Sequence, residues 1–115
     1  MNLDTEVSKE IVEKAYQAVE SARKTGKIKK GVNEVTKAIE RGTAKLVLVA
    51  KDTNPKEVIM HIPMLCEEKG VPFVAVPSRE ELGAAAGLTV PTTSVVIIKE
   101  GESKHLKEVI KKLSE

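Results

Sequence analysis

The chain has 115 residues, of which 41% are apolar and 31% are charged. This length and composition fit one domain with a substantial core, over residues 1–115. The single cysteine excludes an intramolecular disulfide and a cysteine-based zinc finger. One Tyr, one Phe and no Trp disfavour the RNA-binding folds that stack bases on aromatic rings.

No segment of the sequence is apolar enough to cross a bilayer. The longest unbroken apolar run, Leu46–Ala50, is far shorter than the roughly 20 residues that a spanning helix needs. The first six residues include two acids and no basic residue, which disfavours a secretory signal. We therefore expect a cytoplasmic protein without membrane contact.

The first third of the sequence has two helical patterns on either side of a short basic segment. A helix is predicted over about Ser8–Lys24 and ends before Gly26. Its apolar stripe consists of Val7, Ile11, Ala15, Ala18 and Ala22. Ile28 lies in a short extended piece, and a second helix is predicted over Asn33–Arg41, ended by Gly42.

The middle third combines a strand with an interrupted helix. Leu46–Ala50 is predicted to be a strand buried on both faces, because its apolar residues do not alternate with polar ones. Asn54 and Pro55 predict the start of a third helix. Pro63 is expected to break or kink this helix, which resumes over Met64–Lys69.

The last third contains two more buried strands, Phe73–Val76 and Val95–Ile98, and two helices. Ser78–Glu81 has the spacing of a capping box, which predicts a short helix. Gly83 and Gly87 are expected to shorten this helix and to free the loop that follows. A final helix is predicted from its cap and its apolar face, which are Ser103 and then Leu106, Val109, Ile110 and Leu113.

Helices and buried strands that alternate in this way are typical of an α/β fold. We predict a three-layer α/β/α sandwich with a small mixed sheet covered on both faces. The pattern predicts neither the order of the strands nor their directions.

Positive charge is concentrated between Arg23 and Lys45, although the whole chain has a net charge of only +2. This segment contains eight basic residues and two acids, for a net charge of +6, which leaves −4 for the rest of the chain. Such an asymmetry favours a polyanionic partner. Local basic runs also occur on ordinary protein surfaces.

Gly31 leads directly into the second predicted helix, so that a phosphate can approach the free N–H groups of the first turn. Asn33 and Lys37 share one face of this helix, and Glu34 is offset from it by about 100°. Amide, carboxylate and ammonium groups together can read the edges of purine bases. In the alternative, structural interpretation, Asn33 is only an N-cap and Glu34 only pairs with Lys37.

The other reactive residue types lack the spacing typical of catalysis or metal binding. His61 and His105 are 44 positions apart with no ligand pattern around either, and Cys66 is predicted to be a buried, unreactive thiol. Met60 and Met64 are predicted to lie in the core. No phosphate-binding loop, dinucleotide fingerprint or nucleophile elbow is present, so we expect no enzyme, no metal and no cofactor.

The segment 30–37 has the sequence KGVNEVTK, which resembles the K-G-x-N-E-x-x-K signature of the kink-turn RNA-binding family. This family includes the archaeal large-subunit ribosomal protein of the L-seven-Ae type. Further stretches that match lie at 39–47, 61–69 and 82–91. The resemblance covers nearly the whole chain, and it is specific because four motifs occur in order at the right separations.

The resemblance implies an α/β/α sandwich that binds the kink-turn, a bend in RNA built on tandem sheared G·A pairs. It aligns Asn33, Glu34 and Lys37 with the family's readers of guanine edges. It aligns the family's backbone contacts with Lys30, Gly31 and Arg41. The positions that contact or flank the extruded nucleotide correspond to Asn54, Val58, Arg79, Leu88, Thr89 and Val90. Mild departures from the family pattern occur at Lys51, Asn54, Arg79 and Leu88.

The resemblance also implies partners. They are kink-turn RNAs (ribosomal RNA, guide RNAs and the RNA of ribonuclease P, which processes tRNA) and the proteins of guide-RNA particles. The implied roles are in the large ribosomal subunit, in box C/D and H/ACA particles and in ribonuclease P. We expect the free protein to be a monomer. The alternatives from other classes are a small α/β nucleotide-binding regulator and a protein-interaction module, and a closer one is a paralogue with relaxed RNA choice.

Overall fold

The structure, a computed structural model, describes residues 9–54, 56–99 and 109–110. Its elements in chain order are α1 Lys9–Thr25, β1 Lys27–Lys30, α2 Val32–Arg41, β2 Leu46–Ala50, the 3-10 helix η1 Lys56–Val58, α3 His61–Lys69, β3 Phe73–Val76, α4 Arg79–Ala85 and β4 Ser94–Lys99. Helices and strands therefore alternate as the sequence predicted.

The four strands form one mixed sheet in the order β1-β4-β2-β3. β2 and β3 are parallel, whereas β4 runs antiparallel to both of its neighbours, β1 and β2. The short basic piece around Ile28 is the edge strand β1. The predicted mixed sheet is confirmed, and the structure supplies the strand order that the sequence pattern left open.

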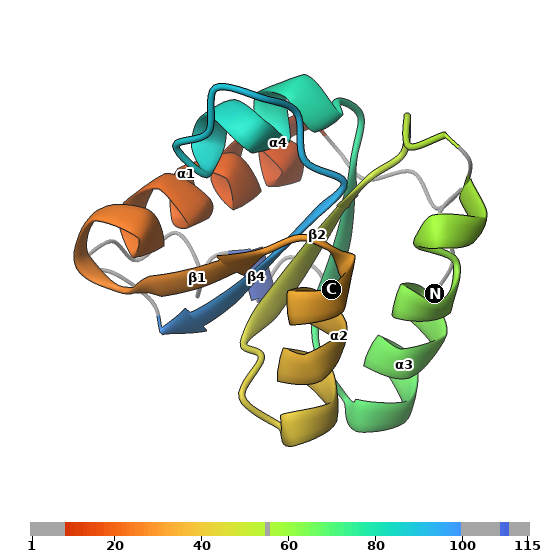
Figure 1. The fold of residues 1–115 in the computed structure, drawn as a ribbon. Helices are drawn as coiled ribbons and strands as arrows, with labels where there is room; N and C mark the ends of the chain where they lie inside the picture. The colour runs from red at the N-terminus through yellow and green to blue at the C-terminus, as the bar shows by residue number, and fades with distance from the viewer. Residues whose placement is uncertain (1–8, 55, 100–108, 111–115) are drawn as a thin grey trace.

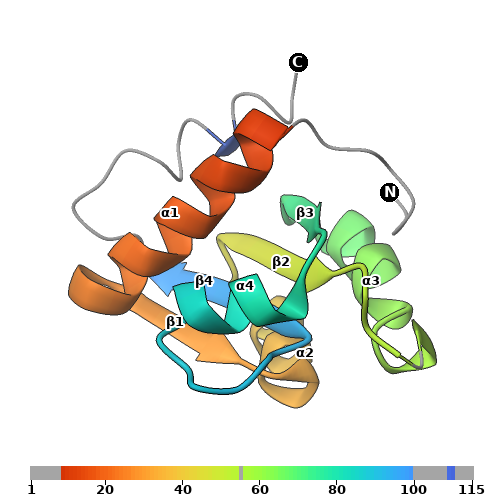
Figure 2. The ribbon, with the colours of Figure 1, turned by 90° about the horizontal axis from the view of Figure 1, so that it is seen from above.

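Helices cover the sheet on both faces, with α1 and α4 on one side and α2 and α3 on the other (Figures 1 and 2). Successive side chains of a strand point to opposite faces. In β2, Leu46 and Leu48 accordingly pack toward α1 and α4, and Val47 and Val49 pack toward α2 and α3. Both faces of β2 are buried, which explains why this strand is apolar throughout.

The connection from β2 to α3 differs from the prediction. The single helix expected from Asn54 is a 3-10 turn, η1, followed by an α-helix that begins only at His61. The amide of Ile59 donates to the carbonyl of Lys56 at 3.0 Å, a bond typical of a 3-10 turn. Pro63 lies inside the first turn of α3, where its missing N–H group is not needed.

The prediction that Met60 and Met64 belong to the core is wrong. Their side chains are 55% and 72% exposed. The buried face of α3 is formed by Ile62 and Cys66, four residues apart, together with Ile59 from the preceding turn. Met60 and Met64 have the same four-residue spacing, so the spacing alone could not show which pair faces the sheet.

The ends of the chain lie largely outside the described residues. Of the predicted final helix, the structure describes only Val109 and Ile110, which are helical. Val109 is buried in the core on the α1 side of the sheet. Other residues from the sequence analysis that lie outside the described part are Val7, Ser8, Pro55, Ser103, His105, Leu106 and Leu113.

Candidate functional site

The sheet topology brings four chain junctions to one edge. Because β1, β2 and β3 run in the same direction and β4 runs against them, three carboxyl ends and one amino end meet there. The turn into α2, the loop after β2, the start of α4 and the loop before β4 all begin or end at this edge (Figure 1). Most of the predicted RNA-contacting residues follow these junctions, and we call the region the junction edge.

Gly31 forms the N-terminus of α2 and fixes it to β4. Its φ of 92° and ψ of 151° lie in a region that is essentially restricted to glycine. Its N–H donates to the carbonyl of Ser94 at 3.0 Å, and its own carbonyl accepts from the amide of Val35. Gly31 is therefore the N-cap of the helix, and Asn33 is the second residue of its first turn.

Asn33, Glu34 and Lys37 all have exposed side chains on the first turns of α2. No side-chain hydrogen bond caps this helix, so Asn33 is not its N-cap. Glu34 makes no ion pair within 4.0 Å with Lys37 or with any other residue that the structure describes. The structural interpretation of these residues is therefore not supported, and their polar groups are available to a ligand.

The start of α4 is held in place by three segments of the chain. The Ser78 hydroxyl accepts from the amide of Glu81 at 3.2 Å, which confirms the predicted cap. The carboxylate of Asp52 accepts from the amide of Arg79 at 2.9 Å. The Tyr16 hydroxyl donates to the Ser78 carbonyl at 3.4 Å, and burial together with the charge of Glu81 raises the pKa of Tyr16 to about 12.

Arg79 is exposed at the first position of α4. The hydrogen bond from its amide to Asp52 joins the loop after β2 to the start of this helix. Nothing in the sequence pattern identified Asp52, because the two residues are 27 positions apart. Asn54 and Val58 lie further along the chain from Asp52; Asn54 is exposed, and Val58 is 43% exposed.

The loop before β4 packs directly on α4, contrary to the expectation that Gly83 frees it. Gly83 is buried, and a Cβ atom there would collide with the backbone carbonyl of Val90. The amide of Leu88 donates to the Gly83 carbonyl at 2.9 Å, and that of Thr92 donates to the Arg79 carbonyl at 3.1 Å. The missing side chain of Gly83 thus permits the close contact between loop and helix.

The three loop residues implied by the resemblance are not equally accessible. Leu88 is half-buried and packs against the core on the α1 side. Thr89 is exposed, and Val90 is 61% exposed. Arg23 at the end of α1 lies against Gly87, which brings a cation beside this loop. Arg23 belongs to the basic segment of the sequence, but no motif marked it as a site residue.

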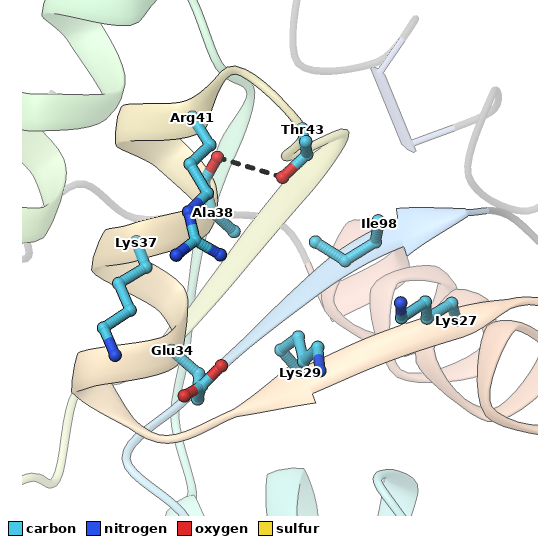
Figure 3. Close-up of a pocket in the computed structure, with 8 residues that line it drawn as sticks. All are labelled: Lys27, Lys29, Glu34, Lys37, Ala38, Arg41, Thr43 and Ile98. Atoms are coloured by element: carbon cyan, nitrogen blue, oxygen red, sulfur yellow. Dashed lines mark hydrogen bonds between the residues drawn. The ribbon is translucent and has the colours of Figure 1, made fainter.

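Arg41 is separated from the junction edge because it lies at the other end of α2. It borders a pocket of about 170 Å³ between α2 and the strands β1 and β4 (Figure 3). The lining residues are Lys27, Lys29, Glu34, Lys37, Ala38, Arg41, Thr43 and Ile98. No motif in the sequence marked Lys27 or Thr43 as a site residue, whereas Lys29 belongs to the basic run that precedes the helix start at Gly31.

The reactive side chains in the described part of the chain were considered as metal ligands or nucleophiles in the sequence, and their surroundings are structural. That part of the chain contains no group of three His, Cys, Asp or Glu residues that could hold a metal ion. Burial raises the pKa of the Cys66 thiol to about 12, so the thiol is unreactive as predicted. The His61 ring shares a 2.9 Å hydrogen bond with the Thr36 hydroxyl, which joins α3 to α2. Within the described ranges, no helix has the length and apolar character needed to span a membrane.

Comparison with known proteins identifies relatives of this fold and this sequence. The model of the ribosomal protein L7Ae/L30e/S12e/Gadd45 family matches residues 13–107. The chain belongs to this family. Among solved structures it is similar to the Giardia lamblia 15.5kD RNA binding protein, with 33% sequence identity and a TM-score of 0.83. The match covers 96% of this chain and 90% of that chain.

Membership of the L7Ae/L30e/S12e/Gadd45 family confirms the resemblance that the sequence motifs showed. The α/β fold is shared with the Giardia protein over nearly the whole chain. A family of this description also agrees with the expectation that the protein is not an enzyme.

Proposed function

We propose that this protein binds RNA and recognises kink-turn motifs through the first turns of α2. The proposal rests on one observation: Asn33, Glu34 and Lys37 are exposed together, and neither a cap nor an ion pair with a described residue occupies them. Membership of a ribosomal protein family and the likeness to an RNA-binding protein from Giardia lamblia support RNA as the ligand.

The three side chains suit guanine edges by their chemistry. The Glu34 carboxylate only accepts hydrogen bonds, so it pairs with the N–H donors of guanine, whereas the Lys37 ammonium only donates, to O6 or N7. The amide of Asn33 does both. Phosphates repel a carboxylate, so Glu34 in the most basic part of the chain indicates contact with bases.

The rest of the junction edge suits an RNA bend in which one nucleotide is turned out of the stack. Val58 at the end of η1 and Val90 in the loop before β4 offer exposed apolar surface, and Arg79 at the start of α4 offers an exposed cation. Contacts of this kind recognise the shape of a folded RNA without aromatic stacking, which agrees with the near absence of aromatic residues in the chain.

The test is a titration of the protein with a kink-turn RNA and with the same RNA after its G·A pairs are replaced, at two salt concentrations. Glu34→Gln removes the charge of the carboxylate and turns one acceptor into a donor. We expect a loss of about 1–3 kcal/mol in binding free energy, confined to the RNA that has G·A pairs.

Glu40→Gln is the matched control, because Glu40 is an exposed glutamate on the same helix. It should leave the affinity for the kink-turn nearly unchanged. Equal losses for both glutamate variants, or equal wild-type affinity for both RNAs, would contradict recognition of the G·A pairs.

We further infer that the protein works in the cytoplasm as a monomer before it joins RNA. We propose assembly with ribosomal RNA of the large subunit, with box C/D and H/ACA guide RNAs and their proteins, and with ribonuclease P RNA. Titrations with each RNA rank these targets. Ordered binding of a free nucleotide at Gly31–Glu34 without RNA affinity would favour a nucleotide-binding regulator instead, and protein partners retained after RNase treatment would favour an interaction module.

A further inference from the structure

The segment 92–94, which leads into β4, holds two halves of the junction edge together. One half is the start of α2 with the predicted guanine readers, and the other is the start of α4 with the loop that contains Val90. We propose that the Thr92 hydroxyl is a positioning group that fixes the two halves relative to each other. Thr92 thereby sets a preference for RNA that contacts both halves at once. This inference rests on the proposed function for the identity of the ligand.

The backbone of the 92–94 segment binds the start of α4 and the end of β2. The Thr92 amide donates to the carbonyl of Arg79, the first residue of α4, at 3.1 Å. The Thr93 carbonyl accepts from the amide of Ala50, the last residue of β2, at 2.9 Å. Two of the chain junctions at this edge are therefore attached to neighbouring residues of one segment.

The last residue of the segment binds the start of α2. The Ser94 carbonyl accepts from the amide of Gly31, the N-cap of that helix, at 3.0 Å. The Thr92 hydroxyl donates to the same carbonyl at 3.3 Å. Thr92 therefore directs one donor to α4 and a second donor to the acceptor that holds α2. The two helix starts are thus connected through the amide and the hydroxyl of one threonine.

Burial gives this connection its strength. Thr92 is 8% exposed and Ser94 is fully buried, so water does not replace the bond between the hydroxyl and the carbonyl if that bond breaks. The hydroxyl of Ser94, by contrast, has no hydrogen-bond partner among the residues that the structure describes. The carbonyl of Ser94 therefore makes the connection, and its side chain takes no part in it.

Contact with α4 limits the loop before β4 on one side. The Val90 carbonyl lies so close to Gly83 that a Cβ atom on that glycine would collide with it. The loop can therefore shift only away from α4, and Thr92, two residues after Val90, is an anchor that opposes this shift. Because Val90 is 61% exposed, such a shift would move an apolar part of the proposed RNA surface relative to the guanine readers.

Preorganisation explains why such a connection affects specificity. When both halves already have the right spacing, RNA that contacts both of them binds without the cost of ordering the loop. RNA that contacts only the guanine readers does not use the loop, so it gains nothing from the connection. Loss of the Thr92 hydroxyl should therefore weaken binding only of RNA that reaches both halves.

The experiment titrates threonine variants with two RNAs. One is a kink-turn RNA, and the other is the same RNA with an abasic site in place of the turned-out nucleotide and with its G·A pairs intact. Thr92→Val keeps the shape of the side chain and the backbone amide but removes the hydroxyl. We expect it to bind the intact RNA roughly fivefold more weakly, which corresponds to about 1 kcal/mol, and the abasic RNA with nearly wild-type affinity. Thr92→Ser keeps the hydroxyl and should bind both RNAs as the wild type does.

Thr53→Val is the matched control, because Thr53 is also buried and its hydroxyl donates to the carbonyl of Ala50 at 2.8 Å within its own loop. That bond joins no second junction, so the ratio of the affinities for the two RNAs should keep its wild-type value. Amide hydrogen exchange in the free protein tests the connection without RNA. Thr92→Val should speed exchange at Gly31 and Thr92, because both amides depend on the 92–94 segment, and Thr53→Val should not.

The remaining outcomes separate this inference from the proposed function. Equal losses of Thr92→Val for both RNAs would overturn the positioning role in favour of a purely structural one, as would an equal loss in Thr92→Ser. Unchanged hydrogen exchange at Gly31 in Thr92→Val, or equal wild-type affinity for the intact and abasic RNAs, would also overturn it. Equal wild-type affinity for kink-turns with and without G·A pairs would instead overturn kink-turn recognition, and no RNA binding at all would overturn both. A circular dichroism melt of each variant identifies any loss that comes from unfolding.

Discussion

Gly31 meets two requirements at the start of α2 that a residue with a side chain cannot meet together. Its backbone lies in a region essentially reserved for glycine, and its amide binds the carbonyl of Ser94. A Cβ atom there would meet nothing within 4 Å, so any cost of Gly31→Ala comes from the backbone conformation and not from a collision. The strain can be relieved only if the first turn of α2 shifts.

We therefore expect Gly31→Ala to lower the free energy of unfolding by about 1–3 kcal/mol and to weaken kink-turn binding as well. Urea denaturation and titration with RNA measure the two effects. Gly70→Ala is the control, since Gly70 also has a positive φ and open space around it but ends α3. It should lose stability and keep its RNA affinity. Normal affinity in Gly31→Ala would show that the position of the first turn does not matter for binding.

At the residue scale, the sequence identified the polar groups of the site but not which hydrogen bonds and ion pairs they make within the protein. Asn33 next to a helix start fits an N-cap as well as a base reader, and only the position of Gly31 as the cap decides between them. Likewise, Glu34 and Lys37 have the spacing of an ion pair. Whether they pair depends on rotamers that neighbouring side chains set, which the sequence pattern does not contain.

At the scale of single elements, α4 fixes the loops of the junction edge. Its first amide, from Arg79, binds Asp52, and its buried Gly83 allows the loop with Val90 to lie on it. The Arg79 carbonyl also accepts from the amide of Thr92 in that loop. The loop after β2 and the loop before β4 are thus both hydrogen-bonded to one residue, Arg79, and their relative position depends on it.

Removal of the Asp52 acceptor should therefore affect both stability and binding. We expect Asp52→Ala to cost about 0.5–2 kcal/mol of stability, the range for loss of a side chain that accepts from a helix N-terminus. Kink-turn affinity should fall too, because Arg79 is no longer fixed. Asp52→Asn keeps an oxygen acceptor at the same place and should restore most of both properties. Thermal melts and RNA titrations of the two variants test this, and equal behaviour of Ala and Asn would exclude the hydrogen bond as the cause.

Secondary structure was predictable wherever burial imposed a strong pattern. The strands β2 and β3 and the middle of β4, Val95–Ile98, are apolar throughout because helices cover both faces. The cap at Ser78 is a local signal between neighbours in sequence. β1 is short, mostly charged and at the edge of the sheet, so it showed little pattern. The start of α3 was predicted wrongly because a proline is compatible with the first turn of a helix as well as with a break.

At the scale of the whole molecule, the strand order creates the junction edge. Sequence motifs after β1, β2 and β3 and before β4 meet only because β4 lies between β1 and β2 and runs against both. No local pattern contains that information, since it depends on contacts between segments far apart in the chain. The same holds for the pocket between α2 and the strands β1 and β4. The basic segment 23–45 contains its four cations, but the fold brings Lys27 and Lys29 of β1 together with Lys37 and Arg41 of α2.

Charge asymmetry across the molecule leads to a prediction about the rate of RNA association. The net charge is only +2 because acids elsewhere balance the basic segment. Glu13 and Glu20 are exposed on α1, on the opposite face of the sheet from α2. Long-range attraction between oppositely charged partners raises association rates and is screened by salt. Glu13→Gln with Glu20→Gln should therefore raise the association rate by roughly twofold at low salt.

The dissociation rate of this double variant should stay unchanged, because neither glutamate touches the proposed RNA surface. Stopped-flow measurements at about 0.05 M and 0.5 M salt separate the effects, since the Debye length falls from more than 10 Å to about 4 Å over this range. The gain in association rate should vanish at the higher salt. A gain that persists there, or a change in the dissociation rate, would place these glutamates in contact with RNA and would contradict an interface limited to α2, β1 and the junction edge.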